Sequence, residues 1–192
     1  ADEQMRMREE QFRETFELAA LGIGHVGASG RFQRVNPRLC DITGYSEAEL
    51  LQRGPDDLTY PDDIADGLAL RERIWSGEIN SYSLEKRYLH KNGSLVWTNA
   101  TVSPVRDPSG AISYTVGILE DISRRKHAEV ELHRQQEINR LLLENLSEGV
   151  VACDENGQLI MFNRAAREWH GADPRELATH EWANYYDLHE AD

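Results

Sequence analysis

Residues 22–37 read GIGHVGASGRFQRVNP and predict two short strands followed by a helix. The strands are Ile23–Val26 and Phe32–Val35, and the glycines between them fit a tight hairpin turn. Asn36 is a residue type that caps helices, and Pro37 is favoured in a first helical turn. The stretch therefore predicts an antiparallel hairpin that leads directly into a short helix.

The same pattern returns 127 residues later in the chain. Residues 16–50 align without a gap on residues 143–177, and seven of the 35 positions are identical. One identical pair is Asn36 with Asn163, a cap position whose residue type is set by backbone geometry. The chain thus contains two copies of one structural unit.

The first copy continues into a complete small domain. Ser46 and Glu49 form the pattern of a capping box, which opens a further short helix. A longer helix follows, and then three strand-like runs at Ser81–His90, Ser94–Val105 and Ile112–Ile122. Two strands, a group of short helices and three strands predict an α+β domain, in which a five-stranded antiparallel sheet carries short helices on one face.

Several short motifs follow one another along the first copy. They are Asn36-Pro37, Thr43-Gly44-Tyr45-Ser46, Glu49-Leu50, Pro61-Asp62-Asp63, Lys91-Asn92-Gly93-Ser94, Trp97, Ser103-Pro104-Val105-Arg106-Asp107, Gly117 and Asp121-Ile122-Ser123. As a set they resemble the PAS domain family of sensor modules, over residues 12–126 in full and over residues 140–192 as an amino-terminal portion. The resemblance implies a PAS fold that senses a small molecule, a redox state, light or a partner, and passes the signal to an output domain.

This interpretation divides the chain into four parts. We expect an N-terminal helix at residues 1–15, a PAS domain at 16–123, a signalling helix at 124–142 and a truncated second PAS domain at 143–192. The second copy ends before any counterpart of the last three strands of the first. Half a sheet would leave unpaired edges, so we expect the natural protein to be longer.

The composition of the chain limits the partners that it can bind and the cellular compartment in which we expect it. The chain has 21 basic and 34 acidic residues, a net charge of −13, which argues against binding to nucleic acid or to an anionic membrane. It has no apolar run long enough for a membrane span and no apolar start typical of a secretory signal. Cys40 and Cys153 are too few for a disulfide framework or a four-ligand zinc site, so we predict a cytoplasmic protein without a metal.

The resemblance implies a pocket between the inner face of the sheet and the short helices. By similarity to flavin-binding relatives, strand alternation turns Thr98, Ala100 and Val102 inward. The candidate lining residues are His25, Leu39, Ile42, Leu58, Ile64, Leu68, Thr98, Ala100, Val102 and Leu119. Two interpretations stay open for this set: a core filled by its own side chains, and a pocket for a small or apolar ligand.

The resemblance also argues against two cofactors. Light-sensing relatives carry an Asn-Cys pair shortly after the Gly-Tyr-Ser motif, and this chain has Gly54 and Pro55 there, so a photoactive flavin–cysteinyl adduct is disfavoured. Haem-binding relatives commonly place a histidine on the long helix, and residues 64–75 contain none. No cofactor is evident, and an unidentified small ligand is the remaining candidate.

A long helix is predicted after the sheet, since no Pro or Gly lies between Arg124 and Leu146. Two stretches show heptad spacing, and the predicted dimer seam is Phe12, Phe16, Ala128, Leu132, Asn139 and Leu142. A coiled coil in a homodimer and a solvated spacer are the two interpretations. The family resemblance further implies a signal-relay ion pair of Asp121 with Arg124 or Lys126.

The sequence lacks a nucleophile elbow, a phosphate-binding loop and a paired-histidine zinc helix. We therefore expect no enzyme activity in this chain and a catalytic output domain elsewhere in the same polypeptide. The resemblance implies a sensory and regulatory module, most often of a sensor histidine kinase. The alternatives are the PAS region of a diguanylate cyclase or phosphodiesterase, and a ligand-free dimerisation module.

Overall fold

The computed structural model describes residues 2–156 and 158–170. They belong to two compact units, which divide between His127 and Ala128. The part of the predicted second PAS domain from residue 171 onward lies outside the described residues.

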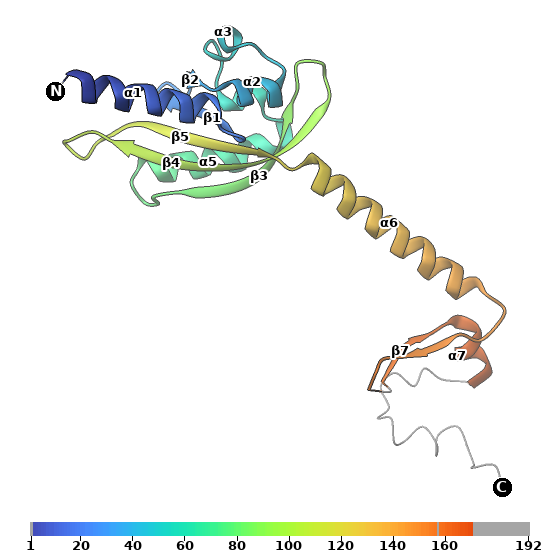
Figure 1. Cartoon of the computed structure of the whole chain (residues 1–192). Helices are drawn as coiled ribbons and strands as arrows, with labels where there is room; N and C mark the ends of the chain where they lie inside the picture. Colours follow the sequence, from blue (N-terminus) through green and yellow to red (C-terminus); the bar gives the residue numbers. More distant parts are fainter. Residues whose placement is uncertain (1, 157, 171–192) are drawn as a thin grey trace. The chain divides into compact units, whose positions relative to one another are not determined.

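The first unit is built on one five-stranded sheet (Figure 1). In chain order it contains α1 (Asp2–Glu17), β1 (Gly22–Gly27), β2 (Phe32–Val35), α2 (Pro37–Thr43), α3 (Glu47–Leu50), α4 (Pro55–Leu58), the 3-10 helix η1 (Pro61–Asp63), α5 (Ile64–Trp75), β3 (Tyr82–Leu89), β4 (Leu95–Arg106) and β5 (Ile112–Asp121). All neighbouring strands are antiparallel, in the order β2-β1-β5-β4-β3. The predicted five-stranded α+β fold is confirmed, and each predicted strand end is within one residue of the observed one.

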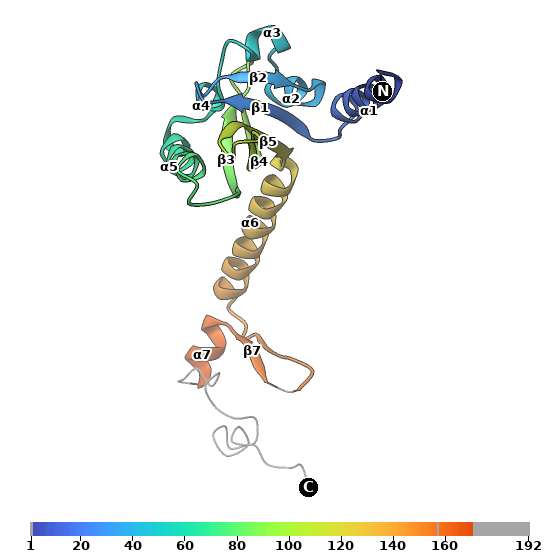
Figure 2. The same cartoon turned by 90° about the vertical axis from the view of Figure 1, so that its left-hand side faces the viewer.

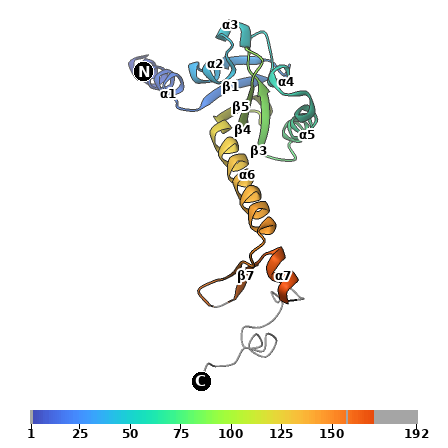
Figure 3. The same ribbon diagram turned by 90° about the vertical axis from the view of Figure 1, so that its right-hand side faces the viewer.

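The hydrophobic core lies between the sheet and the short helices α2, α3 and α4. Its buried members come from both layers: Val26, Phe32, Val35, Leu39, Leu50, Leu58, Tyr88, Ala100 and Leu119. In Figures 2 and 3, α1 and α5 lie on opposite sides of the sheet. The sheet therefore has an inner face toward the short helices and an outer face, part of which α1 covers.

Asn36 is the cap residue that joins three elements of this unit. Its side chain is 1% exposed, and its Oδ1 accepts hydrogen bonds from the backbone N–H of Ile23 (2.8 Å) and of Leu39 (3.0 Å). Its Nδ2 donates to the carbonyls of Phe16 (3.1 Å) and Leu21 (2.9 Å). One amide thus satisfies backbone groups at the end of α1, at the start of β1 and in the first turn of α2.

The second unit begins with the same arrangement. Its elements are most of α6 (Ser123–Asn145), then β6 (Val151–Cys153), β7 (Leu159–Phe162) and α7 (Arg164–His170), and β6 pairs with β7 antiparallel.

Asn163 repeats the hydrogen bonds of Asn36 at an offset of 127 residues. It accepts from Val150 N (2.7 Å) and Ala166 N (3.0 Å), and it donates to Leu143 O (2.8 Å) and Glu148 O (2.9 Å). The internal repeat predicted from the sequence is therefore also a repeat of structure over these residues. It places α6 at the position in the second unit that α1 holds in the first.

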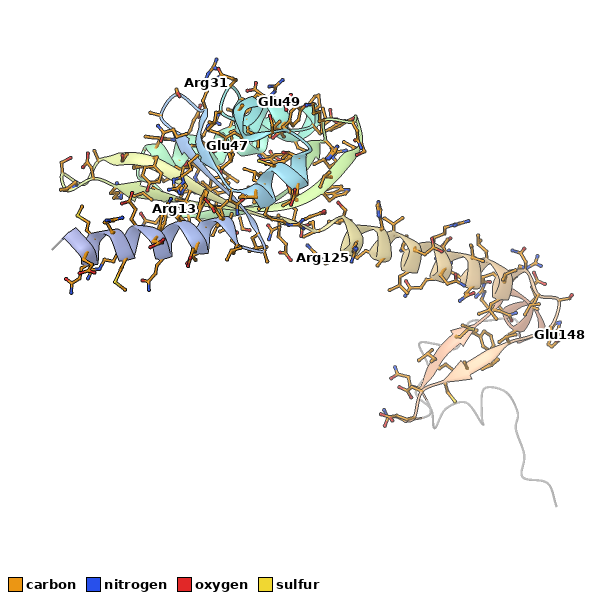
Figure 4. The ribbon with its side chains drawn as sticks, turned by 45° about the horizontal axis from the view of Figure 1, so that its top comes forward. Arg13, Arg31, Glu47, Glu49, Arg125 and Glu148 are labelled. Carbon is orange, nitrogen blue, oxygen red and sulfur yellow. The ribbon has the colours of Figure 1, made fainter. Side chains whose placement is uncertain are left out.

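The capping box of α3 is confirmed, and it also holds a turn of the sheet. The Glu49 carboxylate accepts from Ser46 N (2.9 Å) and from the Lys91 ammonium on the β3–β4 turn (2.7 Å). These two donors lower the pKa of Glu49 to about 2. Figure 4 shows Glu49 on the exposed α3, where solvent screens such a pair.

α6 is the longest of the described helices, with 23 residues. Within the part of the chain that the structure describes, however, neither α6 nor another helix has the apolar character that crossing a membrane requires.

We expect the substitution Asn36→Ala to lower the free energy of unfolding by about 2–4 kcal/mol, because Ile23 N–H and the carbonyls of Phe16 and Leu21 each lose a hydrogen bond in a buried or half-buried place. Chemical denaturation followed by circular dichroism measures this. Asn92→Ala is the matched control, since Asn92 is exposed and its side chain accepts hydrogen bonds from the nearby Ser94 of the same turn. Equal losses in the two variants would contradict the role assigned to Asn36.

Candidate functional site

A cavity of about 40 Å³ lies between the inner face of the sheet and helices α4 and α5. Small residues leave this space open: Gly24, Ala100 and Gly117 on the sheet and Gly67 on α5 all line it. A volume of this size holds a few water molecules or a molecule of a few heavy atoms. It is far below the roughly 300 Å³ at which pockets for cofactor-sized ligands begin.

Three of the predicted lining residues do line the cavity, namely Ala100, Val102 and Leu119. Four more are buried in the surrounding core: Leu39, Ile42, Leu58 and Thr98. The alternation predicted along β4 is confirmed at Thr98 and Ala100, which are buried on the inner face. That these residues bind a ligand stays a prediction.

His25 lies on the outer face of the sheet and does not line the cavity. Strand alternation turns its neighbours Gly24 and Val26 inward, so the histidine must face the other way. Its ring lies 5.5 Å from the ring of Phe16 and 4.9 Å from that of Tyr114. Its inclusion among the pocket residues is therefore corrected.

Burial under α1 lowers the pKa of His25, and the neighbouring Arg34 guanidinium lowers it further. The neutral imidazole is thus favoured, which suits a side chain that packs between two aromatic rings.

The inward face of α5 also differs from the prediction. Leu68 is 37% exposed and Ile64 is half-buried at the helix start, whereas Gly67, Arg71 and Ile74 line the cavity. These three follow at helical spacings of four and three. Hydrophobicity alone favoured the apolar residues, since it does not show that a glycine and an arginine face inward.

Lys86 on β3 is a charged cavity residue that the sequence analysis missed. It is 7% exposed, and its Nζ donates to the Thr59 hydroxyl at 3.2 Å and lies 5.0 Å from the centre of the Tyr88 ring. Burial lowers the pKa of Lys86 from its ordinary value of 10.5 to about 8. The sequence could have indicated this. Lys86 is an even number of residues from Tyr82 and from Tyr88 in the same strand, so the three side chains share one face, and both tyrosines also line the cavity.

An ion pair stands beside Lys86 in the same cavity wall. The Arg71 Nη2 of α5 lies 2.6 Å from the Asp56 Oδ2 of α4, and both residues line the cavity. Burial also raises the pKa values of Tyr82 and Tyr88 above their ordinary value, so both phenols stay neutral. The charged groups of the wall are therefore two cations and one carboxylate.

A second cluster of charged side chains lies on the outer face of the sheet, beside the first turn of α6. Glu85 Oε1 is 2.6 Å from Arg125 Nη2, and Glu85 Oε2 is 2.6 Å from Lys126 Nζ. Trp97 lies between two cations, because Arg87 stands 5.6 Å and Lys126 5.2 Å from its ring. Trp97 faces outward because its neighbour Thr98 faces the interior of the sheet, and Figure 4 shows Arg125 on the first turn of α6.

The backbone of Trp97 also fixes the start of α6. Its N–H donates to Ser123 Oγ (3.1 Å), and its carbonyl accepts from Ile122 N (2.9 Å). Asp121 caps the helix by accepting from Ser123 N at 2.9 Å. The resemblance implied an ion pair of Asp121 with Arg124 or Lys126, and that pair stays a prediction. In the structure the carboxylate of Glu85, in the middle of β3, meets Lys126.

The predicted seam residues have two kinds of surroundings. Phe16 is 5% exposed and packs under Arg34, whose guanidinium lies 4.4 Å from its ring, so Phe16 belongs to the interior of its own domain. Phe12 is half-exposed. The α6 members Ala128, Leu132, Asn139 and Leu142 are all exposed in the single chain. A seam of α6 residues alone is therefore open to a partner.

The described residues contain no group of three or more His, Cys, Asp and Glu side chains able to hold a metal ion.

The comparisons with known proteins agree with this geometry. Residues 32–119 match a family described as PAS fold, and residues 137–192 match a family described as PAS domain. The chain belongs to the PAS domain family. The first match covers β2 to β4, most of β5 and the helices between β2 and β3, and the second begins within α6.

Relatives of this PAS protein are large signalling proteins. It is 38% identical over 139 residues to the probable diguanylate cyclase DgcE of Escherichia coli, and 30% identical over 176 residues to the sensor histidine kinase TmoS of Ectopseudomonas mendocina. The matches cover 72% and 88% of this chain but 12% and 18% of the two relatives.

A solved PAS domain from Colwellia psychrerythraea has the same fold. Its TM-score is 0.57 at 20% identity, over 61% of this chain and 98% of that one.

We expect Lys86→Met to raise the free energy of unfolding at pH 7 by about 1–3 kcal/mol, because a buried ammonium is replaced by an apolar side chain of similar length. The gain depends on pH in a defined direction. Between pH 8 and 10.5 the unfolded chain keeps the Lys86 proton and the folded chain loses it, so the stability of the unsubstituted protein rises through this window.

The advantage of the variant is therefore full below pH 8 and shrinks toward pH 10.5. Urea unfolding at several pH values measures it. A destabilised Lys86→Met variant at pH 7 would show that the ammonium is better solvated than its burial indicates.

Proposed function

We propose that this chain is the sensory region of a signal-transduction protein and that it passes the state of its inner cavity to helix α6. The observation that carries this proposal is the placement of two adjacent residues of β3. Lys86 faces the cavity, and Glu85 faces the first turn of α6, where it meets Arg125 and Lys126. A shift of β3 caused by a ligand on Lys86 would displace Glu85 at the same time.

The contacts at this junction have the strength expected of a switch. Arg125 and Glu85 are 50% and 38% exposed, and exposed ion pairs contribute about 0–1 kcal/mol each. Such contacts are broken by a ligand with a modest difference in affinity for two states. Stronger, buried pairs would fix α6 in one position.

We further propose that α6 pairs with α6 of a second copy in a homodimer. Apolar side chains on α6 are exposed without a partner in the single chain; Leu132 is 61% and Leu142 is 62% exposed. Ala128, Leu132, Asn139 and Leu142 are spaced as one heptad seam, and the polar Asn139 in it lowers the stability of the paired helices.

Two classes of output domain fit the relatives. The sequence analysis favoured a sensor histidine kinase, as in TmoS, but the identity to DgcE is higher, 38% against 30%, and supports a diguanylate cyclase. Assays of the full-length protein for cyclic dinucleotide synthesis from GTP and for autophosphorylation by ATP distinguish the two classes.

The free thiols Cys40 and Cys153 support a reducing cytoplasm as the compartment of the protein.

The relay is tested by Glu85→Gln, which removes the carboxylate charge facing Arg125 and Lys126. We expect the amide of Lys126, which donates to Ile122 O at 3.0 Å, to exchange its hydrogen about 3–10-fold faster in this variant. Hydrogen exchange followed by NMR measures this. Glu120→Gln, the same charge change at an exposed position of β5, should leave the rate unchanged. Equal rates in both variants would reject Glu85 as the link.

The dimer is tested by Leu132→Glu on the proposed seam. We expect it to raise the dimer dissociation constant more than about tenfold in sedimentation equilibrium, because a charge would be buried between two helices. Val130→Glu is the control: Val130 is 67% exposed and lies about 200° around the helix from Leu132. A monomeric unsubstituted chain at tens of micromolar, or an equal effect at Val130, would contradict the seam.

A further inference from the structure

Lys86 brings a buried positive charge into the cavity wall with little to neutralise it. Among the described residues its Nζ has one hydrogen-bond acceptor, the uncharged Thr59 hydroxyl at 3.2 Å. The Tyr88 ring adds a weaker attraction at 5.0 Å. An ammonium carries three donors, so it can bind a further acceptor from the cavity.

The neighbouring charges do not supply that acceptor. Asp56 is paired with Arg71 at 2.6 Å, and these two charges cancel. Asp63, which lies on η1, is held by Arg87 in an ion pair of 2.5 Å. Lys86 therefore leaves one uncompensated positive charge at the cavity, and a single negative charge on a ligand would balance it.

Two glycines keep the cavity open although neither their backbone nor their packing requires glycine. A methyl group added to Gly67 would meet only Lys86 Nζ, at 3.8 Å, and one added to Gly117 would find its nearest neighbours at 3.8 Å. Neither glycine is among those with positive φ. Gly67 lies inside α5, where glycine is less stable than alanine. Gly67 thus preserves the space next to Lys86, and Gly117 preserves space beside Val102 and Leu119 in the same cavity.

The rest of the wall sets the shape of the ligand. Val26, Phe32, Ile74, Val102 and Leu119 form an apolar surface in the same cavity that Lys86 lines. A suitable ligand thus has one anionic end and a short apolar body. About 40 Å³ of space limits that body to a few carbon atoms.

We propose that the cavity is a binding site for a short-chain monocarboxylate, with its carboxylate on the Lys86 ammonium and its aliphatic end against Val102 and Leu119. The inference names the ligand class of the sensory region and in that sense rests on the proposed function. The carboxylate and the ammonium form a charge-assisted hydrogen bond in a site from which bulk water is largely excluded. At neutral pH Lys86 keeps its proton, because its pKa of about 8 lies above that pH.

The first test is thermal unfolding and isothermal titration calorimetry of the 192-residue chain with sodium acetate and sodium propionate. Acetamide and propionamide have the same shape without the charge, and sodium chloride controls for ionic strength. At roughly ten times its dissociation constant the better carboxylate should raise Tm by about 3–6 °C. The amides and the chloride should have no effect.

Variants then locate the site. Lys86→Met should weaken carboxylate binding more than about tenfold, because the anion loses its only charged partner in the pose. Gly117→Ala should weaken binding by occupying the space while leaving the charge in place. Lys91→Met, at a half-exposed lysine on the β3–β4 turn, should leave the affinity within about twofold.

Three results would overturn the proposal: no Tm shift with either carboxylate, an equal shift with the amides, or full binding by Lys86→Met. The Glu85→Gln exchange measurement uses no ligand and keeps the two proposals separable. If Glu85→Gln speeds the exchange of the Lys126 amide but no carboxylate binds, the ligand proposal is rejected and the relay is retained. Carboxylate binding without an exchange effect would retain the ligand site and reject Glu85 as the relay.

Discussion

The buried amide of Asn36 is the interaction on which the arrangement of the first unit depends. A helix end, a strand start and a helix start meet at the buried Asn36, and this one side chain, with two donors and two acceptor positions, bonds to backbone groups of all three. Asn163 solves the same problem in the second unit with the same four bonds. The order of elements around each asparagine follows from this geometry.

One consequence concerns the helices that precede each unit. Since Asn36 holds the carbonyl of Phe16 and Asn163 holds that of Leu143, α1 and α6 are each anchored by their last turn to the unit that follows. The first turn of α6 is anchored as well, by Trp97 and Glu85 of the first unit. α6 thus has contacts at its first turn with the first unit and at its last turn with the second.

Strand β3 connects this helix with the interior of the sheet. The alternation of a β-strand puts Lys86 and Glu85 on opposite faces, so a charge in the cavity and a charge at the helix junction lie next to each other in the backbone. The cavity charge is buried and costly, whereas the junction charge is exposed and weakly held. In the proposed relay a ligand would act on the buried charge, and the exposed contacts would be the ones that break.

The sequence by itself determined the five strands, the caps at Asn36 and Ser46, and the internal repeat, because turn and cap positions accept few residue types and strands alternate with a period of two. It also placed Ala100, Val102 and Leu119 at the cavity. It did not determine which face of α5 turns inward, that His25 packs under α1, or that Glu85 meets α6. Only the tertiary structure decided these, since they depend on which elements, distant in sequence, lie against each face of the sheet.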